Sequence, residues 1–276
     1  MVKEHPIKTV CQILELPRSS FYYRPKLQDE SILEQTILEV AGTWPVYGYR
    51  RITKQLHREN WNVNHKRVYR IMQKMGIQGQ IKRRKRYTTN SQHHYKRFPN
   101  LIKDLTIHRP DQIWASDITY VRLNRGFVYL AVIMDVFTRC IRGWHLSRDL
   151  DHGLTLTALK NSLKKGKPEI HHSDQGLQYA ASEYVNLLQN AGVKISMTDL
   201  GAAWQNGHVE RLIRTIKEEE VDLTEYQDYW DAYSQIGTFL DGVYMHKRIH
   251  SSLNYMTPVE FENGWLRQRS AAHVFS

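Results

Sequence analysis

The centre of the fold is predicted by residues 112–147, "QIWASDITYVRLNRGFVYLAVIMDVFTRCIRGWHLS". This stretch contains three runs rich in β-branched and aromatic residues, and a turn-forming segment, residues 124–126, separates the first two. The second run, residues 127–136, is apolar almost throughout, as is typical of a strand covered on both faces. We therefore expect three consecutive antiparallel strands.

Helices and strands alternate after this stretch. We predict helices near 153–165 and 182–191, short strands at 168–174 and 193–198, and a long helix that contains "QNGHVERLIRTIKEE", residues 205–219. This order predicts an α/β fold with a mixed five-stranded sheet and flanking helices. A helix at 230–247 and a short helix after Pro258 are expected to follow.

The first hundred residues show a different pattern, that of short helices. We predict helices at 7–16 and 29–40, one that begins at Ser19 or Ser20, and two more in "YRRITKQLHREN" and "NHKRVYRIMQKMG". Asn64 and Gly76 are suited to cap the last of these helices at its two ends. Its apolar residues form one stripe, which consists of Val68, Ile71, Met72 and Met75.

Basic residues are concentrated in the same part of the chain. Residues 1–99 contain 20 Lys and Arg against 7 Asp and Glu, a net charge of +13, whereas residues 100–276 contain 19 against 21, a net of −2. Such a positive field favours nucleic-acid binding, because neutralised phosphates release counterions. The side of the last helix opposite its apolar stripe carries Lys66, Arg67, Arg70 and Lys74. This pattern predicts a helix-turn-helix whose second helix lies in a DNA groove, with a solvated basic helix as the alternative.

These patterns divide the chain into four parts. We expect a helical DNA-binding region at 1–78, a basic linker at 79–108, an α/β core at 109–225 and a C-terminal helical extension at 226–276. In the linker, Lys82, Arg83 and Arg84 are expected to contact DNA. His93 and His94 are interpreted as exposed polar residues, because no Cys or suitably spaced His pair stands nearby.

Composition narrows the class of protein further. The sequence has no apolar run long enough to cross a membrane and no secretory signal, so a cytoplasmic protein is expected. Cys11 and Cys140 are too few for a disulfide framework or a four-thiolate zinc site, and both are expected to be buried.

A first candidate carboxylate lies on the first strand of the α/β core. Alternation places Asp117 on the same face as Ile113 and Ala115. An unpaired charge in such surroundings costs several kcal/mol. Asp117 is therefore either the partner of Arg122 or Arg139 in a salt bridge or a ligand for a cation.

A second candidate, Asp174, follows the strand in "HHSDQG". The carboxyl ends of strands are where α/β sheets gather ligands, although a turn-forming or helix-capping role is an alternative. His171 and His172 on that strand are interpreted as structural. Asp135 is also interpreted as structural, paired with Arg139.

The third candidate, Glu210, borders the apolar stripe of the long helix. At about 100° per residue, Glu210, Arg214 and Lys217 fall on one face, which suits a metal site beside phosphates. An ion pair between Glu210 and Arg214 explains this order almost as well. The glutamates at 218–220 are expected to be solvated.

Together these segments resemble a known family. "WASDITY", "HHSDQG" and "NGHVERLIRTIKEE", with 35 residues between Asp174 and Glu210, are similar to the D, D-35-E core of retroviral integrases and related transposases, which has a ribonuclease-H-like fold. The segments "VYGYRRITKQL", "VNHKRVYRIMQKMGI" and "RIHSSLNYMTPVEF" extend the resemblance over most of the chain. The best match is to OrfB-type transposases of bacterial insertion sequences with two reading frames.

The resemblance implies metal-dependent cleavage of DNA 3′ ends and strand transfer at the ends of an insertion sequence. By this resemblance, Asp117, Asp174 and Glu210 bind two Mg²⁺ or Mn²⁺ ions, and hard divalent cations do prefer carboxylate oxygens. Arg214 and Lys217 would then lie along the DNA.

The resemblance also implies partners. These are double-stranded DNA, as terminal inverted repeats and as target, and further copies of the chain on that DNA near the nucleoid. The upstream frame (OrfA) of such elements encodes a leucine zipper and a first helix-turn-helix, so an upstream partner or fusion is expected. The alternatives are a non-catalytic DNA-binding regulator or domesticated remnant, and a nuclease that hydrolyses without joining.

Overall fold

The chain divides into two compact units, residues 1–39 and 40–276. The computed structural model describes residues 6–23, 30–77, 79, 97–199 and 202–274. The first helices are α1 (Ile7–Ile13), α2 (Arg18–Tyr22) and α3 (Ser31–Thr43). α1 is shorter than predicted because Glu15 adopts a left-handed conformation, with φ of 52°, which ends the helix.

Helices α4 (Tyr49–Arg58) and α5 (His65–Lys74) are the two that the sequence predicts for the helix-turn-helix. Asn64 caps α5 as expected, because its side-chain oxygen accepts a 2.9 Å hydrogen bond from the backbone N–H of Lys66. Val68, Ile71 and Met72 are buried and Met75 is partly buried, which confirms the predicted apolar stripe.

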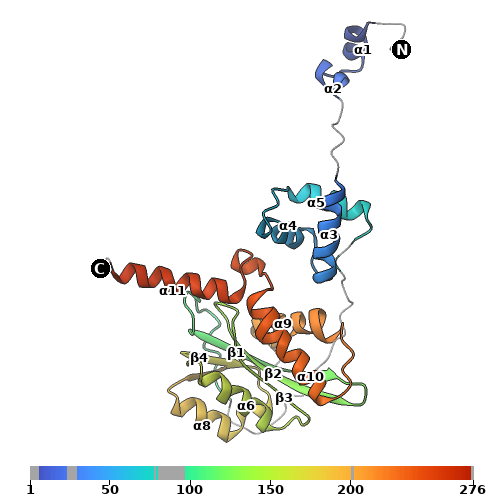
Figure 1. The fold of residues 1–276 in the computed structure, drawn as a ribbon. Helices are drawn as coiled ribbons and strands as arrows, with labels where there is room; N and C mark the ends of the chain where they lie inside the picture. The colour runs from blue at the N-terminus through green and yellow to red at the C-terminus, as the bar shows by residue number, and fades with distance from the viewer. Residues whose placement is uncertain (1–5, 24–29, 78, 80–96, 200–201, 275–276) are drawn as a thin grey trace. The chain divides into compact units, whose positions relative to one another are not determined.

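The core of the second unit is a mixed five-stranded sheet, as predicted (Figure 1). Its strands are β1 (Ile113–Arg122), β2 (Phe127–Asp135), β3 (Ile141–Ser147), β4 (Ile170–Ser173) and β5 (Lys194–Met197). They are arranged in the order β3-β2-β1-β4-β5. The first three run antiparallel, and β4 pairs in parallel with both β1 and β5.

Different helices cover the two faces of the sheet. The covering helices are α6 (His152–Leu163), α7 (Leu177–Ala180), α8 (Ser182–Asn190), α9 (Gly207–Ile216) and α10 (Tyr229–Gly237). On one face, Ile113 of β1 belongs to a buried apolar cluster with Val209 of α9 and Ile236 of α10. On the other face, Trp114 belongs to a cluster with Leu159 of α6. Neighbouring residues of β1 therefore face opposite layers, as their alternation predicts.

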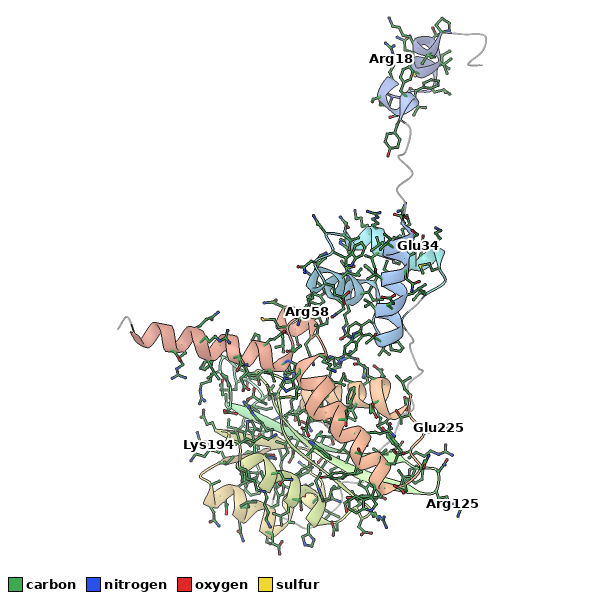
Figure 2. The ribbon with its side chains drawn as sticks, viewed as in Figure 1. Arg18, Glu34, Arg58, Arg125, Lys194 and Glu225 are labelled. Atoms are coloured by element: carbon green, nitrogen blue, oxygen red, sulfur yellow. The ribbon has the colours of Figure 1, made fainter. Side chains whose placement is uncertain are left out.

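The predicted helices at 205–219 and 230–247 are present, but each contains a π-helical turn that the sequence pattern does not predict. α9 continues into a π-helical turn, η2 (Lys217–Val221), and α10 into another, η3 (Thr238–Tyr244). The prediction of a short helix after Pro258 is wrong, because α11 (Pro258–Val274) has 17 residues. A capping box starts α11, in which the Thr257 N–H donates to Glu260 Oε2 at 2.8 Å and the Glu260 N–H donates to Thr257 Oγ1 at 3.3 Å. Arg58 of α4, labelled in Figure 2, also donates to Glu260, at 3.0 Å.

Part of the predicted basic linker lies along the edge strand β5. The backbone N–H of Leu101 donates a 2.9 Å hydrogen bond to Ser196 Oγ of β5, and Phe98 and Ile102 pack against the two apolar clusters. In the described part of the chain, no helix is long and apolar enough to span a membrane. The residues Lys82, Arg83, Arg84, His93 and His94 lie outside the described ranges.

Candidate active site

The register of two parallel strands places Asp117 beside Asp174. Ile113 of β1 lies opposite Ile170 of β4. The pairing continues to Ala115 and His172, so Asp117 and Asp174 each follow the last pair by two residues. The charge of Asp174 accordingly acts on Asp117. Ile113 and Ile170 both belong to the cluster under α9, so alternation turns the two carboxylates toward that helix.

Glu210 comes from the first turn of α9 on the same face of the sheet. The start of this helix is attached to β1 by Asn206, the last residue of the 3₁₀ helix η1 (Ala203–Asn206). The buried Asn206 amide donates a 3.0 Å hydrogen bond to the backbone oxygen of Ser116. Ser116 directly precedes Asp117, so this bond holds the Glu210 helix beside the first carboxylate. The sequence pattern does not single out Asn206, because its partner is 90 residues away.

The three carboxylates interact electrostatically. Asp117 is partly buried, and its pKa is raised from 3.8 to about 8, first by desolvation, then by the charge of Asp174, and more weakly by that of Glu210. A 2.8 Å hydrogen bond from the Ile118 N–H to Asp117 Oδ1 and the ammonium of Lys217 act in the opposite direction. Crowded carboxylates of this kind are stabilised by a proton or by a bound cation.

The structural alternatives hold for one of the three residues. Asp174 Oδ1 accepts a 3.0 Å hydrogen bond from the Gly176 N–H, so Asp174 does shape the turn after β4. None of the ion pairs between described residues involves Asp117 or Glu210. The side chain of Arg139 instead lies 2.8 Å from Nδ1 of His208.

Asp135 is structural, as predicted, but it does not pair with Arg139. The residue is fully buried, and its carboxylate accepts 2.6 Å hydrogen bonds from the backbone N–H groups of Asp111 and Thr138. Backbone donors close to Asp135 in the fold therefore take the place of the expected ion pair.

The two histidines of β4 are also structural. His171 Nε2 lies 2.9 Å from the Tyr184 hydroxyl, and His172 Nδ1 lies 2.9 Å from Ser196 Oγ. Burial lowers the pKa of His171 to about 3 and that of His172 to about 4. Both rings are therefore uncharged at neutral pH.

The prediction that residues 218–220 are solvated is wrong, because all three are partly buried. Glu220 accepts a 3.1 Å hydrogen bond from the Tyr226 hydroxyl, and Glu219 forms an ion pair. The Glu219 carboxylate is 6% exposed and accepts two 2.6 Å hydrogen bonds from the guanidinium of Arg248, which is 2% exposed. Arg51 Nη1 lies 3.7 Å from the same carboxylate. Helical periodicity does not show this ion pair, because the covering residue comes from 29 positions further along the chain.

The predicted DNA-contacting residues are placed as follows. On α5, the side chains opposite the buried stripe are Lys66, Arg70 and Lys74, which are exposed, and Arg67, which is partly buried. On the helix of Glu210, Arg214 and Lys217 are partly buried, and the Lys217 ammonium lies 4.2 Å from the centre of the Tyr120 ring.

Among the residues that the structure describes, no group of three or more His, Cys, Asp or Glu side chains is gathered closely enough to hold a metal ion.

Comparison with protein families identifies the chain. Residues 107–203 and 191–258 match the integrase core domain, and residues 26–85 match an HTH-like domain. Over 268 residues the chain is 31% identical to the putative transposase InsK of insertion sequence element IS150 from Escherichia coli (strain K12), and the match covers 94% of each chain. The chain belongs to the IS3-family transposases.

The chain is also 34% identical, over 229 residues, to the transposase for insertion sequence element IS904 from Lactococcus lactis subsp. lactis (strain IL1403). That match covers 78% of this chain and 87% of the relative. Among solved structures, the HTLV-2 integrase catalytic core domain in complex with magnesium is 18% identical, with a TM-score of 0.40 over 55% of the transposase and 96% of that domain. The integrase-core match and the sheet order confirm the ribonuclease-H-like fold class. The transposase is accordingly a DNA-cleaving and strand-transfer enzyme.

Proposed function

We propose that Asp117, Asp174 and Glu210 are the catalytic residues of this transposase and that they bind two Mg²⁺ or Mn²⁺ ions. What supports the proposal is that the charges of Asp174, which follows β4, and of Glu210, on α9, both act on Asp117 of β1. The pairing of β1 with β4 and the hydrogen bond from Asn206 to Ser116 place these three segments next to one another. The three residues come from three different segments of the chain, so no single helix or strand could bring them together.

The donor set suits the proposed ions. Three carboxylates offer only oxygen ligands, which hard divalent cations prefer over nitrogen and sulfur. Their mutual repulsion, which contributes to the raised pKa of Asp117, would be relieved by divalent cations. When bound, two such ions would activate the attacking oxygen and stabilise the leaving oxygen of an in-line phosphoryl displacement.

The residues of the chain have distinct parts in this proposal. The Gly176 N–H orients the carboxylate of Asp174, and Asn206 positions the helix of Glu210 against β1. Arg214 and Lys217, on the helix of Glu210, contact phosphates of the reacting strand. Water attacks first and releases a DNA 3′-hydroxyl, which then attacks a phosphodiester of the target DNA.

We also propose how the rest of the transposase serves this site. Helix α5 binds the terminal inverted repeats, and residues 79–108 link it to the core, which spans 109–225 before a helical extension at 226–276. Several copies assemble on the DNA, with the upstream-frame product as a partner or fusion. The α5 residues that contact phosphates or bases are Lys66, Arg67, Arg70 and Lys74, followed by Lys82, Arg83 and Arg84 in the linker.

The test is strand transfer with the element's own terminal DNA. Glu210→Gln is expected to abolish transfer in Mg²⁺ and to leave binding of the DNA ends nearly intact, because only a metal-binding charge is removed. Glu225→Gln, at an exposed glutamate labelled in Figure 2, is the matched control and should retain transfer. Retained transfer by Glu210→Gln would contradict the proposal. A pre-cleaved end that is joined to target DNA separates a transposase from a simple nuclease.

A further inference from the structure

A positively charged pocket lies on the other side of α9 from Glu210. Its volume is about 230 Å³. Its walls come from α4, from the turn after β2, from α9, and from the segment that leads into the 3₁₀ helix η4 (Ser251–Leu253). The charged and hydroxyl side chains that line it include Arg51, Arg139, Arg211, Arg248, Ser251 and Ser252.

The helical period of α9 separates this arginine pocket from the carboxylates. At about 100° per residue, His208 and Arg211 fall on one side of the buried stripe, and Glu210 and Arg214 fall on the other. A helix with its side chains is about 10 Å across, so the pocket lies roughly one helix diameter from Glu210. The two regions are therefore neighbours without sharing a side chain.

The arginine pocket has an excess of positive charge. Among the described residues, the carboxylates that act on its arginines are Glu219, which pairs with Arg248 and Arg51, and Asp135, which acts on Arg139. Four guanidinium groups thus face two carboxylates, of which Glu219 is already hydrogen-bonded by Arg248 and Asp135 by backbone N–H groups. An anion in the pocket would balance the remaining charge.

His250 at the pocket does not change this balance. Burial lowers the pKa of His250 most, and the charges of Arg248, Arg51, Arg139 and Arg211 lower it further, to about 2. The ring is therefore neutral at physiological pH, and all four guanidinium groups of the pocket act on it.

We propose that the arginine pocket binds a backbone phosphate of DNA, separate from the phosphate that reacts. Guanidinium groups pair with phosphate oxygens through two parallel hydrogen bonds, and serine hydroxyls can donate further ones. Arg211, Ser251 and Ser252 are exposed, so a polymer can reach them from outside. The position of this phosphate relative to the reacting one rests on the proposed function, whereas its binding does not.

The experiment measures DNA binding by the full chain in EDTA, with a duplex of arbitrary sequence and a series of KCl concentrations. Removal of one phosphate contact lowers the slope of log affinity against log salt by about 1. We expect this change for Arg211→Gln, together with weaker binding, and we expect Arg211→Lys to keep the slope because it keeps the charge. Arg125→Gln, at an exposed arginine of the β1–β2 turn labelled in Figure 2, is the matched control and should behave as the native chain does.

A second measurement separates DNA from free phosphate. The thermal midpoints of the native chain and of Arg211→Gln are compared in potassium phosphate and in KCl of equal ionic strength. An unchanged salt slope in Arg211→Gln overturns the proposal, and stabilisation by inorganic phosphate with an unchanged slope would assign the pocket to a free phosphate instead. Glu210→Gln should retain the native slope, so loss of the metal site and loss of this pocket give different results.

Discussion

Replacement of Glu219 by Gln is expected to destabilise the transposase strongly. Glu219 and Arg248 are almost fully buried and are joined by two hydrogen bonds of 2.6 Å, with Arg51 Nη1 at 3.7 Å. Glutamine has nearly the same shape but carries no charge, so Arg248 would remain buried with its main counter-charge removed. The effect therefore tests the ion pair rather than the packing.

The magnitude follows from the burial of both partners. Removal of one member of a buried ion pair costs about 3–5 kcal/mol, because the remaining charge is desolvated and unpaired. The nearby Arg51 adds repulsion in the same direction, since its charge and that of Arg248 then face each other across the lost carboxylate. Replacement of both partners together, as Glu219→Leu with Arg248→Met, should cost less than Glu219→Gln alone, because no charge is left behind.

Urea unfolding followed by tryptophan fluorescence measures this prediction. A loss of 3–5 kcal/mol should move the midpoint of Glu219→Gln by on the order of 1 M or more. Glu225→Gln, at an exposed position, is the control and should stay within about 0.5 kcal/mol of the native chain. A midpoint for Glu219→Gln that matches the control would refute the reasoning, as would a double variant that is less stable than the single one.

Two further predictions concern the carboxylates. The pKa of Asp117 is about 8 in the folded protein and 3.8 when unfolded. Between pH 3.8 and 8 the folded state therefore binds one proton more than the unfolded state does. The free energy of unfolding of the metal-free protein should fall as the pH rises through this range. Asp117→Asn should flatten that part of the urea-midpoint profile in EDTA, and an unchanged profile would argue against the crowding. Asn206→Ala removes the 3.0 Å bond to Ser116 and should slow strand transfer by roughly 10- to 100-fold while DNA binding persists, as measured by product formation with pre-cleaved ends. An unaltered rate would show that this bond does not position Glu210.

Much of the fold could be predicted from local sequence because its signals are periodic. Alternation along residues 113–121 assigns side chains to the two faces of β1, and the stripe at Val68, Ile71 and Met72 assigns the core face of α5. The short helix α7 and the length of α11 were harder to predict. Helix α7 has only four residues, too few to show a periodic pattern. Helix α11 contains Gly264, a residue that favours the end of a helix, yet the helix starts at a capping box and continues past this glycine.

Contacts with covering segments were the least predictable part of the site. The burial of Glu219 depends on Arg248, and the attachment of α9 depends on a backbone oxygen of β1. Neither partner leaves a periodic signal, because each pair of residues is brought together by the path of the chain. The expected partner of Asp135 failed for the same reason, since backbone N–H groups already satisfy its carboxylate.

The amino-acid sequence was enough to predict the order of strands and helices along the chain, the basic character of the first hundred residues, and three carboxylates whose spacing indicates an integrase-like core. These properties depend on residue type and on distances along the chain. The sequence did not predict which charges are buried, which are paired, and which gather without an opposite charge. That outcome depends on segments far apart in sequence, as in the ion pair of Glu219 with Arg248 and in the pocket where Arg51, Arg139 and Arg211 meet. The same residue types are solvated or buried according to what the fold places over them.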